Sequence, residues 1–346
     1  MKMIQLRRCC RDLRGPAIVG LALAACAFGV ASAPAQDLAA ELKQVPYRIV
    51  YETWHDNNWE IFSIKADGSD PANLTATPDI HELCPHVSPD GTKICLSVDE
   101  GEGDAKVRNV YYMKMDGSGR TLVAKNARQA CWKADGTAIA YLGGEFDEFS
   151  IKDFATRGVF IYDLATGRRT QHPNRELYHL YNLCWSPDGK WFLATVHGGM
   201  GYSHAILAIE AEGTRVVNLE IPGCRPDISS DGKHVAWGPS DWVLRAGDLD
   251  FSGPVPKVVH QRDLVESEKP LEIYHVDWSP DGRYVVFSRG PKRKVLGNIP
   301  EIVGVRAQDW NICVADATQM NRWTTITSDG NSNKEPDWVP VRRANP

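Results

Sequence analysis

The residues best suited to chemistry stand at one fixed distance before a repeated hairpin turn. Counting back four places from the hairpin serine, or from the residue in its position, selects Cys84, Gln129, Asn182, Arg225, His275 and Glu335. Five of these side chains are polar, and together they offer a cation, a carboxylate, an imidazole and two amides. Such groups around one opening would suit an anionic or hydroxyl-rich ligand such as a sugar. The plainer alternative is that they bind channel water and satisfy strand ends.

Two histidines share a second position, seven places before the same turn. They are His81 and His179, and Tyr178 precedes the second of them. Because imidazole is a common metal ligand, His81, His179 and His275 are the candidates for a divalent metal, although the sequence requires no cofactor. A turn contact repeated by duplication explains the first two equally well. The predicted ligand-binding residues are His81, Gln129, Tyr178, His179, Asn182, Arg225, His275 and Glu335, and no catalytic residue is assigned.

An internal repeat identifies the elements that must position these residues. Five segments end in Asp-Gly between apolar runs, with glycines at Gly91, Gly136, Gly189, Gly232 and Gly282, which are 45, 53, 43 and 50 residues apart. Three of them read Ser-Pro-Asp-Gly, in which proline presets φ, aspartate caps the turn and glycine accepts a positive φ. Alternating apolar residues after each turn predict half-buried strands. Four antiparallel strands in about 45 residues are the size of a propeller blade.

The two ends of the repeat region set the number of blades. Residues 47–54 have the pattern of the second strand of a blade, and residues 335–340 match a first strand with nothing after it. Pairing these segments would close the ring and remove its free edges. We therefore predict an all-β fold, a six-bladed β-propeller over residues 47–340, with a short linker at 36–46 and a tail at 341–346.

The repeat resembles that of a known family. The Trp-Ser-Pro-Asp-Gly turns at 185–189 and 278–282, together with strands such as Val-Phe-Ile-Tyr-Asp-Leu at 159–164, are similar to the PD40 (WD40-like) repeat of TolB-like six-bladed propellers. The resemblance covers residues 47–340 and implies the fold. It implies little about function, because such propellers include binding proteins, peptidase accessory domains and polysaccharide lyases. TolB also carries an α/β domain before its propeller, whereas only residues 36–45 precede the first blade here.

The first 35 residues have the layout of an export signal. Five basic residues up to Arg14 precede an apolar run at 17–31, and Ala33-Pro-Ala35 forms a cleavage signature. The run is shorter than the roughly 20 residues of a membrane-spanning helix, so we predict no transmembrane span. The stretch that ends at Cys26 also reads as a lipobox, which makes a lipid anchor the alternative to soluble export. Both readings predict a periplasmic or secreted protein.

The charge of the chain narrows the range of partners. The net charge is −5 for the full sequence, and it becomes −9 once the five basic residues and one acidic residue of the export signal are removed. An acidic protein is poorly suited to nucleic acid or to an anionic membrane surface. The predicted partner is therefore a small molecule or glycan, or a protein of the cell envelope.

Two functions from different classes remain. The first is an exported, non-catalytic propeller that binds a ligand or partner through the face with long, irregular loops, because loops on a rigid scaffold commonly carry function. The second is a polysaccharide lyase for uronic-acid oligosaccharides, with Arg225 and Gln129 at the substrate carboxylate and a histidine-bound metal. The sequence contains neither G-x-S-x-G nor H-E-x-x-H, and this favours the first function.

Overall fold

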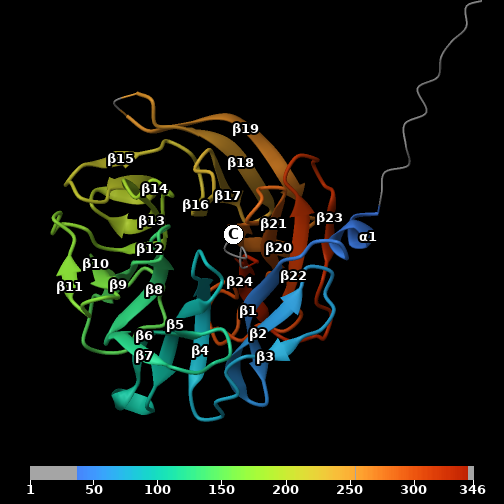
Figure 1. Ribbon diagram of the computed structural model, residues 1–346, viewed down its shortest axis with the longest axis horizontal. Helices are drawn as coiled ribbons and strands as arrows, with labels where there is room; N and C mark the ends of the chain where they lie inside the picture. Colours follow the sequence, from blue (N-terminus) through green and yellow to red (C-terminus); the bar gives the residue numbers. More distant parts are fainter. Residues whose placement is uncertain (1–36, 254, 342–346) are drawn as a thin grey trace, which may run out of the picture. The chain divides into compact units, whose positions relative to one another are not determined.

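Six antiparallel sheets of four strands each form a ring in this computed structural model, which describes residues 37–253 and 255–341 (Figure 1). The predicted export signal, the lipobox cysteine Cys26 and the residues after 341 lie outside the described residues. No helix in the described part of the chain is long and apolar enough to cross a membrane. The six-bladed architecture expected from the repeat is confirmed.

The blades follow the chain in order. The first blade contains β24 (Asn333–Val339), β1 (Arg48–His55), β2 (Asn58–Lys65) and β3 (Ala72–Asn73). The second contains β4 (His81–Val87), β5 (Lys93–Glu100), β6 (Val107–Lys114) and β7 (Thr121–Ala124), with the short helix η1 (Gly103–Ala105) between β5 and β6. The third contains β8 (Ala127–Trp132), β9 (Ala138–Gly144), β10 (Thr156–Asp163) and β11 (Arg169–Gln171).

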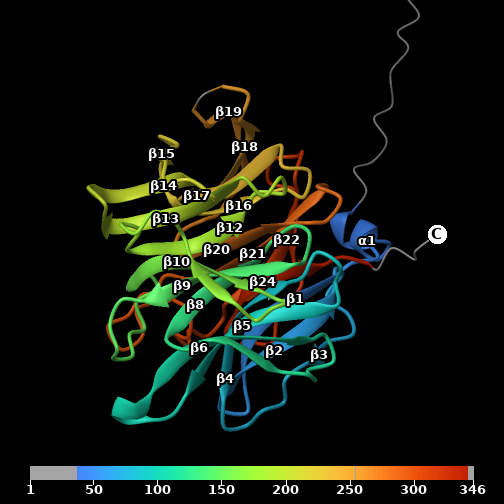
Figure 2. The same cartoon turned by 60° about the vertical axis from the view of Figure 1, so that its left-hand side comes forward.

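The fourth contains β12 (Leu180–Trp185), β13 (Trp191–Gly199), β14 (Tyr202–Glu210) and β15 (Val216–Asn218). The fifth contains β16 (Cys224–Ile228), β17 (His234–Ser240), β18 (Val243–Asp250) and β19 (Lys257–Glu266), whose long outer hairpin projects at the top of Figure 2. The sixth contains β20 (Leu271–Trp278), β21 (Tyr284–Pro291), β22 (Asn311–Asp316) and β23 (Trp323–Thr325).

The ring closes where the two ends of the repeat region meet. Strand β24 pairs antiparallel with β1, from Arg48 opposite Val339 to Thr53 opposite Asn333. The hydroxyl of Thr53 also donates a hydrogen bond of 2.6 Å to the Asn333 side chain across this seam. The first blade is thus built from both ends of the repeat region, as the sequence predicts, and no first strand is left unpaired.

The hairpin turns adopt the geometry that their residues favour. In the turn at 279–282, the Ser279 hydroxyl donates to Asp281 over 2.7 Å, and the Gly282 N–H donates to the Ser279 carbonyl over 2.9 Å. Gly282 has φ +70°, which costs glycine little and a side chain considerably more. The same serine–aspartate contact recurs at residues 88, 186 and 229. Each turn therefore fixes the register between the first and second strands of its blade.

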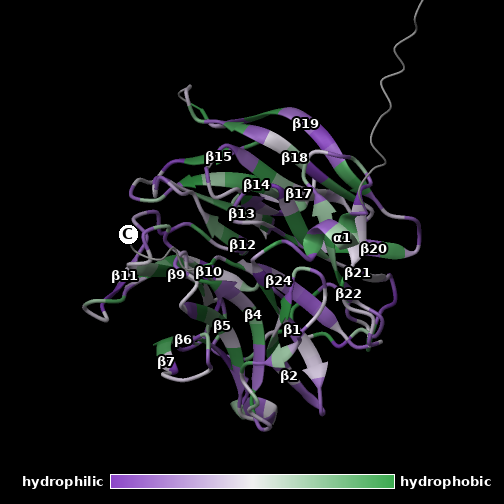
Figure 3. Ribbon diagram, turned by 45° about the vertical axis from the view of Figure 1, so that its right-hand side comes forward, coloured by the Kyte–Doolittle hydropathy of each residue, from purple (hydrophilic) through white to green (hydrophobic). Residues whose placement is uncertain are grey.

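A short helix covers the closing seam. Residues 36–46, expected to be a linker, contain α1 (Leu38–Leu42), whose Leu38 and Leu42 are buried among residues of the first and sixth blades. Figure 3 shows α1 as a largely hydrophobic element beside these strands. The helix also places Glu41 within hydrogen-bonding distance of Arg283, Tyr284 and Arg322. This segment is consequently part of the packed propeller.

Candidate functional site

The innermost strand of every blade carries a bulge at the position that the sequence singled out. The pairing between first and second strands shifts register in all six blades, for example between Leu83 and His86. The six residues of this position all have a left-handed backbone, with φ between +47° and +58°; they are Cys84, Gln129, Asn182, Arg225, His275 and Glu335. A bulge re-aims the side chains of its strand. We call these six residues the axial ring.

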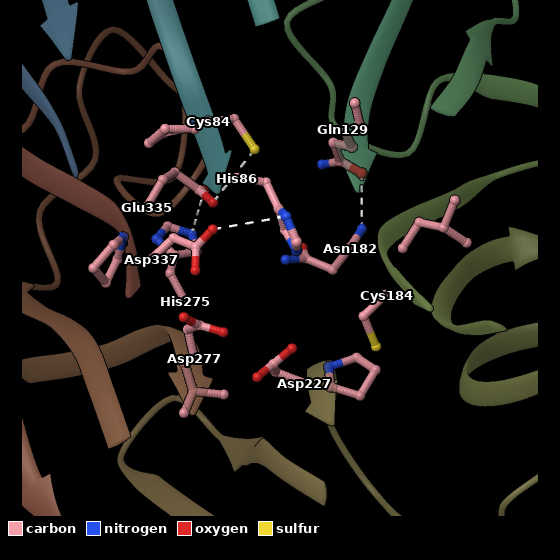
Figure 4. Close-up of a pocket in the computed structure, with 16 residues that line it drawn as sticks. Cys84, His86, Gln129, Asn182, Cys184, Asp227, His275, Asp277, Glu335 and Asp337 are labelled. Atoms are coloured by element: carbon pink, nitrogen blue, oxygen red, sulfur yellow. Dashed lines mark hydrogen bonds and ion pairs between the residues drawn. The ribbon is translucent and has the colours of Figure 1, made fainter. Parts of the chain in front are cut away.

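The axial ring surrounds a narrow cavity on the propeller axis. All of its members except Arg225 line this cavity, whose volume is about 70 Å³ (Figure 4). One water molecule needs roughly 10–15 Å³ on the same scale, so the cavity has room for several waters or for a very small ligand. Five of the six residues therefore lie around the axis, where the sequence predicts them.

Contacts within the axial ring link neighbouring blades. The Asn182 N–H donates to Gln129 Oε1 over 2.8 Å, and Arg225 Nη1 donates to Asn182 Oδ1 over 3.0 Å. Glu335 Oε1 lies 3.6 Å from Arg225 Nη1 and 2.9 Å from His275 Nε2. Polar contacts therefore connect these ring members, although both ring nitrogens of His275 and Oε1 of Glu335 have no hydrogen bond among the described residues.

Two long connections close over the ring on the loop-rich face. Asp153, from the β9–β10 connection, forms an ion pair of 3.1 Å with Arg225, and the Glu301 carbonyl accepts from Arg225 over 3.4 Å. Arg225 is only 5% exposed as a result, and His275 only 4%. We expected an open mouth at this end of the channel, but buried charges are costly without partners, and the loops supply those partners.

Burial sets the protonation states of the ring. It lowers the pKa of His275 to about 4, against the opposing effect of Glu335, so this imidazole is neutral at pH 7. Burial alone would raise the pKa of Glu335, but the neighbouring His275 and Arg225 hold it at about 2. For Arg225 the acidic neighbours Asp153 and Glu335 outweigh burial and raise its pKa. Arg225 thus lies as a cation between Glu335 of the ring and Asp153 of the β9–β10 connection.

Three aspartates, of which Asp337 is buried and the other two are half-buried, form a second layer that the sequence did not indicate. Asp227, Asp277 and Asp337 lie two residues after ring positions in consecutive blades and line the same cavity (Figure 4). Each carboxylate accepts a backbone N–H of the next blade, from Trp278 (3.0 Å), Trp338 (2.9 Å) and Val87, respectively. Counting back two places from the hairpin serine, instead of four, would have found them. Their hydrogen bonds tie blades together, which is a structural role.

A chain of six aromatic rings runs along the loop-rich face of the third and fourth blades. Successive ring centroids are 5.0, 6.1, 4.5, 5.7 and 6.4 Å apart along the series Tyr178, His179, Phe154, His197, His204 and Tyr181. His197 and His204 are directly opposite one another on β13 and β14, and both are exposed. Tyr178, His179 and Phe154 are half-buried. We call this series the aromatic arc.

Hydrogen bonds hold the arc in place. His179 contacts the Gly198 carbonyl through Nδ1 over 2.8 Å and Glu145 through Nε2 over 3.0 Å. The Tyr181 hydroxyl lies 2.9 Å from His204 Nε2, and because burial raises the pKa of Tyr181, this phenol stays protonated and can donate. The sequence indicated Tyr178 and His179, whereas nothing in it distinguished Phe154, which reaches the arc from a connection of another blade.

The three histidines proposed for a metal have separate surroundings. His81 stacks on Trp54, with ring centroids 5.9 Å apart, and its Nδ1 accepts the Trp59 N–H over 3.3 Å. His179 belongs to the aromatic arc and His275 to the axial ring. Within residues 37–253 and 255–341, no group of three or more histidine, cysteine, aspartate or glutamate side chains could hold a metal ion. The geometry therefore does not unite His81, His179 and His275 as metal ligands.

Comparisons with known proteins support the fold. No family model matches the sequence, and no curated protein matches it. Among solved structures, TolB from Acinetobacter baumannii superimposes with a TM-score of 0.58 at 18% identity, covering 85% of this chain and 67% of that one. A chain of a nidogen/laminin complex also gives 0.58, at 8% identity, covering 86% of this chain and 99% of that one. By its fold, this chain is a six-bladed β-propeller that is similar in structure to TolB.

Proposed function

We propose that this chain is an exported binding protein that holds its ligand on the aromatic arc of the loop-rich face. The observation that carries the proposal is the arc itself, six rings in continuous contact of which two are exposed and three half-buried. Aromatic rings offer large apolar surfaces with polar edges, and this combination suits the faces and hydroxyl groups of a carbohydrate. The layout of residues 1–35 supports export.

The architecture around the arc favours binding over catalysis. The charged groups of the axial ring are buried and paired with one another, so they stabilise the surface above them. Phe154 of the arc directly follows Asp153, the aspartate that pairs with Arg225, and this ion pair supports the connection that carries the ring. A scaffold fixed before the ligand arrives reduces the entropy lost on binding. In the part of the chain that the structure describes, the histidines that the lyase hypothesis requires lie apart, so their arrangement does not support it.

The proposal is tested by measuring saccharide binding to the protein that begins at Gln36. The probes are maltohexaose, chitotetraose and trigalacturonate, and their binding is measured by saturation-transfer NMR and calorimetry. We expect saturable binding of at least one probe, with an affinity about tenfold lower in the Phe154→Ala/His197→Ala variant, since each lost stacking contact is worth about 0.5–1.5 kcal/mol. Thermal unfolding of the variant shows whether the fold is retained.

The matched control is His260→Ala, which removes an exposed imidazole from β19 on another blade. This control should bind the probes as the unmodified protein does. Equal affinity of the arc variant and the unmodified protein would show that the arc is not the site. If the protein bound an envelope protein but none of the saccharides, the ligand of this face would be a protein and not a carbohydrate.

A further inference from the structure

A second concave surface lies within the long connection between β21 and β22 of the sixth blade. The outgoing arm (Pro291, Arg293, Lys294, Val295, Leu296) and the returning arm (Arg306, Ala307, Gln308, Asp309) enclose an open cleft of about 550 Å³. This volume falls within the roughly 300–1,000 Å³ typical of small-molecule sites. The cleft belongs to a different blade from the aromatic arc.

The middle of this connection, between its two arms, is held firmly to the propeller. The fully buried Lys334 donates from Nζ to the carbonyls of Pro300, Ile302 and Val305 over 3.1, 2.7 and 2.9 Å. At the end of the returning arm, Trp310 is completely buried. The connection is therefore anchored between its two arms and again at the end of the returning arm.

The cleft collects cations that have no acidic partner. Arg293, Lys294 and Arg306 are exposed, and none of them forms an ion pair with a carboxylate of the described residues. The neighbouring Lys292 differs, because it pairs with Asp241 over 2.6 Å and with Glu272 over 2.9 Å. Asp309 is the one acidic residue along the cleft. The cleft thus carries three cations and one carboxylate, in a chain whose net charge is negative.

The position of Arg306 is also defined. Its guanidinium carbon lies 5.0 Å from the centroid of the Trp54 ring, a cation–π contact that restrains the side chain and leaves its N–H groups for another partner. Guanidinium groups bind carboxylate and phosphate through paired hydrogen bonds, and a lysine nearby adds a point charge. Val295 and Leu296, the latter 96% exposed, add apolar surface to the outgoing arm.

We infer that this cleft is a binding site for a small polyanion that carries carboxylate or phosphate groups, held by Arg293, Lys294 and Arg306. The site is separate from the aromatic arc, so the chain would have two ligand sites on two blades. Charge-assisted hydrogen bonds from three cations supply the affinity, and the width of the cleft limits the size of the anion.

Calorimetry with pyrophosphate and with citrate, at about 10 mM ionic strength to limit screening, tests the inference and distinguishes phosphate from carboxylate. We expect saturable binding of at least one probe, and an affinity at least tenfold lower in Arg293→Gln/Lys294→Gln/Arg306→Gln. The control Lys190→Gln/Lys233→Gln/Lys257→Gln removes the same charge from exposed positions elsewhere and should bind normally.

Three results would overturn the inference: no saturable binding of either probe, undiminished binding by the cleft variant, or an equal loss in the control. The last result would mean that only the net charge of the protein matters. The arc variant Phe154→Ala/His197→Ala should bind the polyanion normally. A failure of this site is therefore distinguishable from a failure of the proposed saccharide site.

Discussion

At the scale of single residues, Arg225 connects the axial ring to the loops above it. It lies against Asp153 and Glu335, it donates to Asn182, and its guanidinium carbon is 5.5 and 5.6 Å from the ring centroids of Tyr181 and Tyr274. Removing this side chain would take away the cation that forms ion pairs with both Asp153 and Glu335 in the buried centre of the molecule. An unpaired buried charge is among the most destabilising changes that a single substitution can cause.

We therefore expect Arg225→Met to lower the free energy of unfolding by about 3–5 kcal/mol, as measured by urea denaturation at pH 7. The loss should shrink at lower pH, where protonation can neutralise the stranded carboxylates. Arg245→Met is the control, because the Arg245–Asp263 pair is about one-quarter exposed and should cost less than about 1 kcal/mol. Equal losses in both variants would contradict the role assigned to Arg225.

At the scale of elements, α1 matters because it lies where the ring closes. Leu42 is 1% exposed and packs in the same cluster as Trp338 of β24 and Tyr284 of β21. Glu41 accepts hydrogen bonds from Tyr284 and Arg322, and these lower its pKa. The helix thus joins the first blade to the sixth through both apolar and polar contacts.

Shortening the buried side chain of α1 should weaken this seam. We expect Leu42→Ala to lower the free energy of unfolding by about 2–3 kcal/mol, because it removes buried methyl groups and leaves a cavity. The adjacent Lys43→Ala removes an exposed side chain and should change stability by less than about 0.5 kcal/mol. Equilibrium unfolding in urea checks both values. If Leu42→Ala matched Lys43→Ala, the helix would not contribute to closure.

At the scale of the whole molecule, buried carboxyls make stability depend on pH. Burial raises the pKa of Asp337 to about 6, and those of Glu82 and Glu272 to about 7. A group whose pKa is higher in the folded state stabilises the fold while it is protonated. This contribution is complete below about pH 4 and is lost as the pH rises through 6 to 7. The pKa of His275 is lowered to about 4, so its contribution has the opposite sign: it decreases the free energy of unfolding as the pH falls below about 6.5.

Among the described residues, eight carboxyls with a raised pKa oppose five histidines with a lowered pKa. Because the carboxyls are more numerous, we expect the free energy of unfolding to be larger at pH 5 than at pH 8. Asp337→Asn should narrow this difference, since an amide keeps an oxygen for the Val87 N–H but does not ionise. Asp70→Asn is the control, because the ion pair with Arg48 lowers the pKa of Asp70 and places its titration below this range. Urea denaturation at both pH values checks the prediction; a protein equally stable at both would contradict it.

The sequence by itself determined the fold, the number of blades and the position of the axial ring. These features depend on local chemistry that repeats: Asp-Gly turns force hairpins, alternating apolar residues make half-buried strands, and unmatched strands at 47–54 and 335–340 close the ring. A residue at a constant distance from such a turn occupies the same place in every blade. Residues such as Gln129 and His275 could therefore be placed around one axis without coordinates.

Only the tertiary structure decided what surrounds those residues. Three features join segments that are distant in sequence. The connections at 145–155 and 292–310 close the channel, Phe154 takes its place in the aromatic arc, and α1 packs on the seam. Irregular loops carry no repeat from which their path could be inferred. Whether Arg225 faces solvent or a buried Asp153 depends on that path, and so the accessible surface, unlike the fold, could not be predicted from the chain alone.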